Sequence, residues 1–144
     1  MYEWTQKYVG IPFVSGGRTE QGLDCYGLIR LIHLNEYNIE LPLLNENYED
    51  ALNAEETKDL FGKYIPVILG HKIELPEEKA ICLMRTSNRL LTHVGMYAGD
   101  GFIIHARNKT GVVCERINSP LLTGRIEGWY HVGKSYNTTT SILQ

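Results

Sequence analysis

The chain has 144 residues, of which 43% are hydrophobic and 22% charged, and its formal net charge is −3. This size and composition predict one globular domain with a single buried core. Its 14 basic and 17 acidic residues form no long like-charge run, which argues against nucleic-acid binding and a polybasic membrane anchor. We expect neither an export signal nor membrane insertion, because no apolar stretch approaches the roughly 18 residues of a bilayer span.

The first half of the chain has mainly helical and turn signals. Tyr2–Tyr8 is expected to form a short helix, and glycines and polar residues fill the turn-rich segment 10–22. Asp24 suits the N-cap of a helix that runs to about Tyr37, since its carboxylate can accept an unpaired backbone N–H. The segment 46–64 has an acidic pattern that is compatible with a further helix.

After Pro76 the pattern changes to short β-prone runs separated by turn residues. The tripeptide "GDG" between two of the runs is a hairpin signal. Helices followed by hairpin-linked strands predict an α+β fold, with N-terminal helices packed on a C-terminal antiparallel sheet. We expect one domain over residues 1–135 and a loose tail over 136–144. The expected strands are "AICLMR", "HVGMYA", "GFIIHA", "GVVCERI" and "RIEGWYHV".

The cysteines are an odd number and include no CxxC pair, which argues against a disulfide framework and a zinc knuckle. Cys25 is expected at the N-terminus of a helix, where the helix dipole and free N–H groups lower a thiol pKa. A thiolate held there is a nucleophile, and the backbone N–H of Cys25 is suited to stabilise an oxyanion. The alternative is a buried cysteine that only packs, which is what we expect of Cys82 and Cys114.

Two histidines flank the predicted hairpin, and both are candidates to act with a thiol. His93 opens one strand and His105 closes the next, and their even separation places both side chains on one face. One imidazole would take the thiol proton while the other orients it. Zinc bound by Cys25, His93 and His105 is the alternative, and no fourth ligand stands out. We therefore expect no metal and no cofactor.

These stretches together resemble the NlpC/P60 family of papain-like cysteine peptidases that act on cell walls. Typical members carry "GxPYxxGG", "DCSG" at a helix start, "HVGIY" and a strand that ends in histidine. This chain carries "GIPFVSGG", "DCYG", "HVGMY" and "FIIHA" in the same order, from Gly10 to Ala106. Four such stretches in family order are a specific signal.

The resemblance implies that Cys25 is the nucleophile, His93 the general base and His105 the residue that orients His93. It also implies cleavage of peptidoglycan stem peptides through a thioester, typically between γ-D-glutamate and a diamino acid. Asp24 is expected to contact the amine of the stem peptide, to cap the helix, or both. Phe13 replaces the family's usual tyrosine and Tyr26 its usual serine, so both are expected to shape the binding cleft.

The "DCxGL" pattern and the closing "SPLLTGRIEGWYHV" resemble short proteins from the tail tips of tailed phages and prophages. This likeness implies a virion protein that is made in the host cytoplasm, meets other tail-tip proteins and opens the cell wall during infection. Two alternatives remain. One is a structural tail-tip subunit with little or no activity, and the other is a CHAP-like amidase with the same Cys–His pair.

Overall fold

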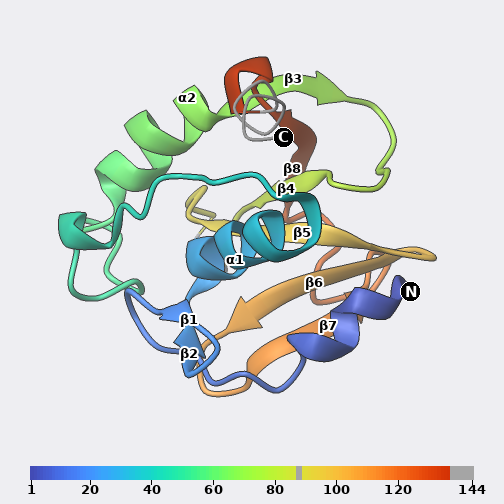
Figure 1. Cartoon of the computed structure of the whole chain (residues 1–144), viewed down its shortest axis with the longest axis horizontal. Coiled ribbons are helices and arrows are strands. Elements are labelled where there is room, and N and C mark those ends of the chain that lie inside the picture. The colour runs from blue at the N-terminus through green and yellow to red at the C-terminus, as the bar shows by residue number, and fades with distance from the viewer. Residues whose placement is uncertain (87–88, 137–144) are drawn as a thin grey trace.

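The computed structural model describes residues 1–86 and 89–136 (Figure 1). It contains a short 3₁₀ helix η1 (Glu3–Lys7), a small hairpin of β1 (Arg18–Thr19) and β2 (Gly22–Leu23), and the helix α1 (Cys25–Tyr37). The predicted helix therefore lies where its cap and periodicity place it. It ends because Asn38 adopts a left-handed conformation, with φ of 55°, from which its N–H bonds back to the carbonyl of His33.

The expected helix over residues 46–64 is wrong for most of its length. The chain forms a 3₁₀ turn η2 (Asn45–Asn47), then irregular turns, then a π-helical turn η3 (Leu60–Tyr64) that leads into the short helix α2 (Ile65–Ile68). The reason is local competition for backbone groups. The side chain of Asp50 accepts from the N–H of Leu52, and Asn53 accepts from two further N–H groups, which favours turns over a helix.

The predicted strands are all present and form one antiparallel sheet with the order β3-β8-β4-β5-β6-β7. Sequence reasoning missed the edge strand β3, which pairs with β8 through Leu69, Lys72 and Ile73, because its short "LGHKI" run has no alternating strand pattern. The strands are β3 (Leu69–Ile73), β4 (Ile81–Met84), β5 (His93–Gly99), β6 (Phe102–Arg107), β7 (Gly111–Arg116) and β8 (Ile126–Val132).

Helix α1 lies across one face of the sheet, over β5 and β6 (Figure 1). Its apolar side chains and the inward side chains of these strands form the main core. A second, smaller cluster covers the opposite face, where Cys82 and Met84 pack with Trp129 and Leu122. Both faces of the central strands are therefore buried, and the α+β architecture expected from the sequence is confirmed.

No helix within the described ranges is long and apolar enough to cross a membrane. The extent of the domain, residues 1–135, stays a prediction. Residues 137–144 of the expected tail lie outside the described part of the chain.

Candidate active site

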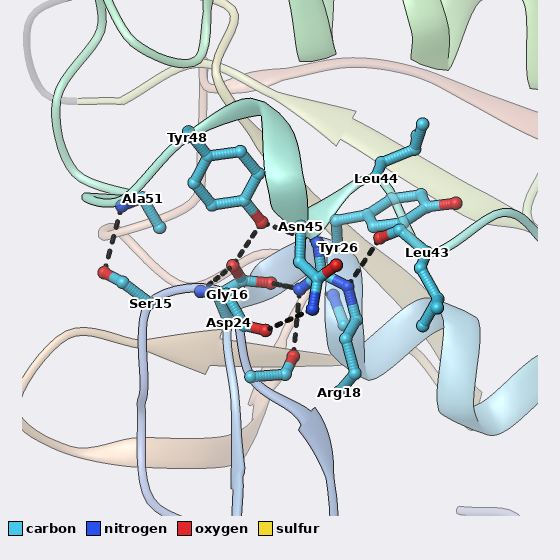
Figure 2. A network of polar contacts seen from close by, with 12 residues as sticks. Ser15, Gly16, Arg18, Asp24, Tyr26, Leu43, Leu44, Asn45, Tyr48 and Ala51 are labelled. Carbon is cyan, nitrogen blue, oxygen red and sulfur yellow. Dashed lines mark hydrogen bonds and ion pairs between the residues drawn. The ribbon is translucent and has the colours of Figure 1, made fainter.

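The start of α1 is fixed by the carboxylate of Asp24, which the structure buries completely. One oxygen, Oδ1, accepts from the N–H of Gly27 at 2.8 Å and from Nη1 of Arg18 at 2.8 Å. The other, Oδ2, accepts from the N–H of Gly16 at 2.8 Å and from the hydroxyl of Tyr48 (Figure 2). The helix-cap prediction for Asp24 is confirmed.

This arrangement disfavours the expected contact between Asp24 and a substrate amine. Four donors occupy the carboxylate, and its charge is balanced by Arg18, whose side chain is 5% exposed against 1% for Asp24. An external amine would have to replace one of these partners in a buried site, at a large desolvation cost. The burial and the four partners of Asp24 therefore favour a structural role, and its contact with a substrate amine stays a prediction.

Arg18 connects this helix start to the segment that follows α1. Its Nε donates to the carbonyl of Leu43 at 2.7 Å, and its Nη2 donates to the hydroxyl of Tyr48 at 2.7 Å. The guanidinium also lies near the rings of Tyr26 and Tyr48, 5.2 and 5.8 Å from their centroids. Figure 2 shows how these contacts hold the loop after α1 against the helix N-terminus. Sequence reasoning missed Arg18 and Tyr48, because one lies in the two-residue strand β1 and the other in the irregular segment after α1, and neither carries a motif.

The residue after the cysteine, Tyr26, does not line the cleft as the sequence led us to expect. Its side chain is fully buried in the core, and its hydroxyl donates to the carbonyl of Pro42 at 2.6 Å. On a helix, neighbouring residues project in directions about 100° apart, so Tyr26 packs in the core while Cys25 lines a cavity with His93. Tyr26 is therefore out of reach of a substrate, and the expectation that it shapes the binding cleft is wrong.

Gly27, which ends the "DCYG" motif, permits this packing. A Cβ at this position would lie 1.9 Å from the carbonyl oxygen of Gly17, which is backbone and cannot rotate away. The first turn of α1 thus needs a glycine to lie against the loop that carries Arg18.

Cys25 occupies the first turn of α1, and 7% of its surface is exposed. It lines a cavity of about 100 Å³ together with His93 of β5 and with Phe13, as predicted for the position of Phe13. The remaining lining is formed by side chains of the 51–57 segment, by Ala106 of β6 and by polar residues that flank the ends of β4, β5 and β6. These are Ala51, Leu52, Ala54, Thr57, Thr86, Thr92, Ala106 and Asn108.

The two hairpin histidines meet as their spacing predicts. Nε2 of His93 lies 2.8 Å from Nδ1 of His105, and Nε2 of His105 lies 3.0 Å from Oε1 of Glu115 on β7. Arg107 donates to the same oxygen of Glu115 at 3.0 Å. Gly95 leaves room for this contact, because a Cβ there would be 3.0 Å from that of His105. A relay of polar groups thus runs from Arg107 to His93 across three strands.

Glu115 determines which nitrogens of this relay carry protons. A carboxylate only accepts hydrogen bonds, so Nε2 of His105 carries the proton and its Nδ1 is an acceptor. Nε2 of His93 must then donate to that acceptor, which leaves Nδ1 of His93 unprotonated. The relay thus prepares a bare imidazole nitrogen on the residue that shares a cavity with Cys25.

The electrostatics favour neutral forms of both Cys25 and His93. Burial, and then the charge of Asp24, raises the pKa of the Cys25 thiol to about 12, although N–H groups of Val94 and Tyr26 act against this shift. Burial, with the charges of His105 and Arg107, lowers the pKa of His93. Desolvation thus opposes the expected resting thiolate and outweighs the effect of the helix N-terminus. Both shifts favour a resting pair of a thiol and a neutral imidazole.

The other cysteines and histidines lie elsewhere. Cys82 is fully buried in the second core cluster, and Cys114 is partly buried on β7. His33 is buried on α1, and His131 on β8 contacts Glu77 on the surface. Among the described residues, no group of three or more His, Cys, Asp or Glu side chains is placed to hold a metal ion.

The profile described as the NlpC/P60 family matches residues 10–129, which include Cys25, both hairpin histidines and most of the sheet. The chain belongs to the NlpC/P60 family. Members of this family are cysteine peptidases, and the site described above lies wholly within the matched range.

The curated relatives of the chain are named as endopeptidases or as a glutamyl hydrolase. It is 25% identical over 118 residues to a "Probable endopeptidase" of Haemophilus influenzae, covering 82% of this chain and 64% of the relative. It is 25% identical over 124 residues to the "Gamma-DL-glutamyl hydrolase" of Bacillus subtilis, covering 85% of this chain and 26% of the relative. The "Murein DD-endopeptidase MepS/Murein LD-carboxypeptidase" of Escherichia coli is 24% identical over 118 residues, covering 77% and 50%. The chain thus spans less than two thirds of each relative.

Solved structures share the fold. The NlpC/p60 domain of the peptidoglycan hydrolase SagA has a TM-score of 0.56 at 20% identity, covering 88% of this chain and 91% of that one. An NlpC/P60 family protein from Bacillus cereus has a TM-score of 0.60 at 20% identity, covering 87% and 36%. At these identities the likeness concerns the fold alone.

Within this NlpC/P60 domain, sequence reasoning missed Glu115. Its position in "GVVCERI" carries no motif, and its role depends on the register in which His105 pairs with Val113. In that register Glu115 is the diagonal neighbour of His105, within reach of its ring. The sequence does carry one signal for Glu115. It lies two residues after Val113, so both side chains project from the same face of the strand.

Proposed function

We propose that the chain is a cysteine endopeptidase that cleaves the stem peptides of peptidoglycan. One observation carries this proposal. Cys25 and His93 line one cavity, and the relay from Glu115 through His105 leaves Nδ1 of His93 as the free base. A thiol beside an oriented, unprotonated imidazole is the arrangement that acyl transfer through cysteine requires.

Acylation follows from the neutral resting pair. As the Sγ atom of Cys25 attacks the carbonyl carbon of the scissile amide, its proton passes to Nδ1 of His93. The backbone N–H groups at the start of α1 are placed to stabilise the oxyanion that forms. The imidazolium then gives its proton to the leaving amine as the C–N bond breaks, which leaves a thioester on Cys25.

Deacylation uses the same base. His93 takes a proton from water, whose oxygen attacks the thioester carbonyl, and the C–S bond breaks to release a carboxylic acid and restore the thiol. His105 holds the ring of His93 throughout, and the negative charge of Glu115 stabilises the imidazolium through His105.

The bond we propose lies between γ-D-glutamate and the following diamino acid. The name of the Bacillus subtilis relative supports a γ-glutamyl substrate, and that of the Escherichia coli relative supports murein. The second name also points to a D,D-amide cross-link as a competing bond. Products from the two bonds differ in mass, so one assay distinguishes them.

The test is product analysis by liquid chromatography and mass spectrometry after incubation with purified muropeptides. We expect fragments with a new γ-D-glutamyl carboxylate from the wild type and none from Cys25→Ala or His93→Ala. Cys114→Ser is the matched control, because this cysteine lies outside the cavity, and it should keep full activity. Release of the lactyl group would identify an amidase, and absence of any turnover would favour a structural subunit.

We further propose that the chain acts in the tail tip of a phage or prophage, next to other tail-tip proteins and at the bacterial cell wall. The support is the likeness of "DCYG" and of the closing "SPLLTGRIEGWYHV" to short phage proteins. Mass spectrometry of purified particles should find the chain at a fixed ratio to tail proteins. Its absence from particles, with the chain present in the same lysate, would contradict this location.

A further inference from the structure

A second cavity, of about 280 Å³, shares Thr86, His93 and Asn108 with the cavity that Cys25 lines. His93 and His105 form part of its lining, whereas Cys25 does not. The guanidinium-bearing residues Arg85, Arg107 and Arg125 line the rest, with Met84, Thr86, Asn108 and Leu122. A neighbouring cavity shares Arg85 and Arg125 and adds Arg89. We call these two cavities, which share Arg85, Thr86 and Arg125, the arginine pocket.

The arginine pocket is positive although the chain as a whole carries a net charge of −3. None of the residues that line either cavity is acidic. Arg107 is paired with Glu115, but in the described ranges no carboxylate forms an ion pair with Arg85, Arg89 or Arg125. Their charges are thus available to an external anion.

The backbone fixes the two central arginines side by side. The N–H of Arg85, just after β4, donates to the carbonyl of Arg125, just before β8, at 2.7 Å. The last pair of the β4–β8 ladder, Met84 with Ile126, lies directly next to this bond. The pocket also contains no lysine. Arginine is the side chain that matches a carboxylate with two parallel hydrogen bonds, so this composition favours a carboxylate over a spherical anion.

The position of the pocket determines which half of the substrate it meets. In the proposed reaction His93 returns its proton to the leaving amine, so the amine half of the substrate lies on the His93 side of the thiol. His93 lines both cavities, whereas Cys25 lines only the first and the arginines line only the second. A carboxylate on the residue that supplies the leaving amine would therefore lie among the arginines.

We propose that Arg85 and Arg125 bind the free carboxylate of the diamino acid on the leaving side of the scissile bond. The inference rests on the proposed peptidase function and deepens it. It makes the enzyme selective for stem peptides whose diamino acid keeps an ionised carboxylate. Peptides in which that carboxylate is amidated or extended would bind weakly.

The experiment compares three peptides that differ by single carboxylates. The reference is L-alanyl-γ-D-glutamyl-L-lysine, the second is its C-terminal amide, and the third carries D-isoglutamine in place of D-glutamate. Affinity is measured by calorimetry on the Cys25→Ala variant, which needs no turnover. Loss of charge-assisted hydrogen bonds predicts about tenfold or greater weakening for the C-terminal amide and a smaller effect of isoglutamine.

We expect two variants in the Cys25→Ala background, Arg125→Gln and Arg85→Gln, to bind the peptide acid about tenfold more weakly. Each variant should also bind the acid no more tightly than the C-terminal amide. Arg116→Gln is the matched control, because Arg116 lies over the Phe102 ring and lines neither cavity. Equal affinity for acid and amide, or an unchanged ratio in both arginine variants, would overturn the inference. So would a larger loss from isoglutamine, which would place the carboxylate site on the acyl side.

Turnover of the same peptides by the wild type separates the two proposals. Failure to hydrolyse any of them would contradict the peptidase, whereas calorimetry would still decide whether the pocket binds the carboxylate. Hydrolysis of acid and amide with the same kcat/KM would support the proposed peptidase function and contradict the proposed binding of the carboxylate by the arginine pocket.

Discussion

Replacing Asp24 by Asn tests whether this residue is structural, as its burial and partners indicate. Asn keeps the size of the side chain but removes the charge that balances Arg18 in a site where both side chains are almost fully buried. It also turns an NH₂ group toward the N–H of Gly16 or of Gly27, since each carboxylate oxygen accepts from one of them. At least one buried hydrogen bond is therefore lost together with the ion pair.

The expected cost follows from these contacts. Breaking a buried pair by removing one partner costs about 3–5 kcal/mol, because the remaining charge is left uncompensated. The unfolding entropy of a chain of this length is about 0.3 kcal/mol/K, at about 2.1 cal/mol/K for each residue. Asp24→Asn should therefore lower Tm by about 10–17 °C.

Thermal unfolding followed by circular dichroism measures this change, and Arg18→Met serves as the partner variant. The double variant Arg18→Met/Asp24→Asn should be more stable than Asp24→Asn alone, because it leaves no unpaired buried charge. A fall in Tm below about 3 °C, combined with weaker binding of peptides that carry a free N-terminal amine, would refute the reasoning. Asp24 would then be a substrate ligand.

Glu115→Gln should lower kcat about tenfold and move the acid limb of the pH–rate profile to lower pH, because burial lowers the pKa of His105 and the Glu115 carboxylate opposes that shift. An unchanged kcat and acid limb would contradict the relay. Burial lowers the pKa of His33 to about 4, so the folded chain binds fewer protons than the unfolded chain below about pH 6.5 and loses stability as the pH falls. By about pH 5 this loss is about 2 kcal/mol, and chemical denaturation of His33→Leu should show an acid loss smaller by that amount. Gly27→Ala should lower the free energy of unfolding by about 3 kcal/mol or more, because the new Cβ would clash with the carbonyl oxygen of Gly17. Gly62→Ala is the control, because a Cβ there meets open space and should not destabilise the chain. Equal Tm values for the two variants would contradict the packing described for Gly27.

The sequence was sufficient for features that depend on local pattern. The cap at Asp24 and the apolar periodicity after it predict α1, and alternation with turn residues predicts the strands from β4 to β8. The even spacing of His93 and His105 about a short turn predicts their contact, which the structure confirms at 2.8 Å.

Features that depend on tertiary environment were not predictable in this way. The helix N-terminus favours a thiolate at Cys25, but its degree of burial decides the pKa, and burial is a property of the folded chain. Tyr26 follows the nucleophile in sequence yet faces the core, because adjacent helical residues point in different directions. Arg18 reaches Asp24 from the short strand β1 and Tyr48 from the irregular segment after α1, so no spacing rule connects them.

The central claim is that Cys25 is the nucleophile and that His93 activates it. The most direct measurement is intact-protein mass spectrometry, with peptide mapping, after reaction with a stem-peptide analogue that carries an acyloxymethyl ketone in place of the scissile amide. We predict one adduct, located on Cys25, with a rate that falls about a hundredfold or more in His93→Ala and is unchanged in His33→Leu. An adduct on Cys82 or Cys114, or labelling of Cys25 that is indifferent to His93, would contradict the account.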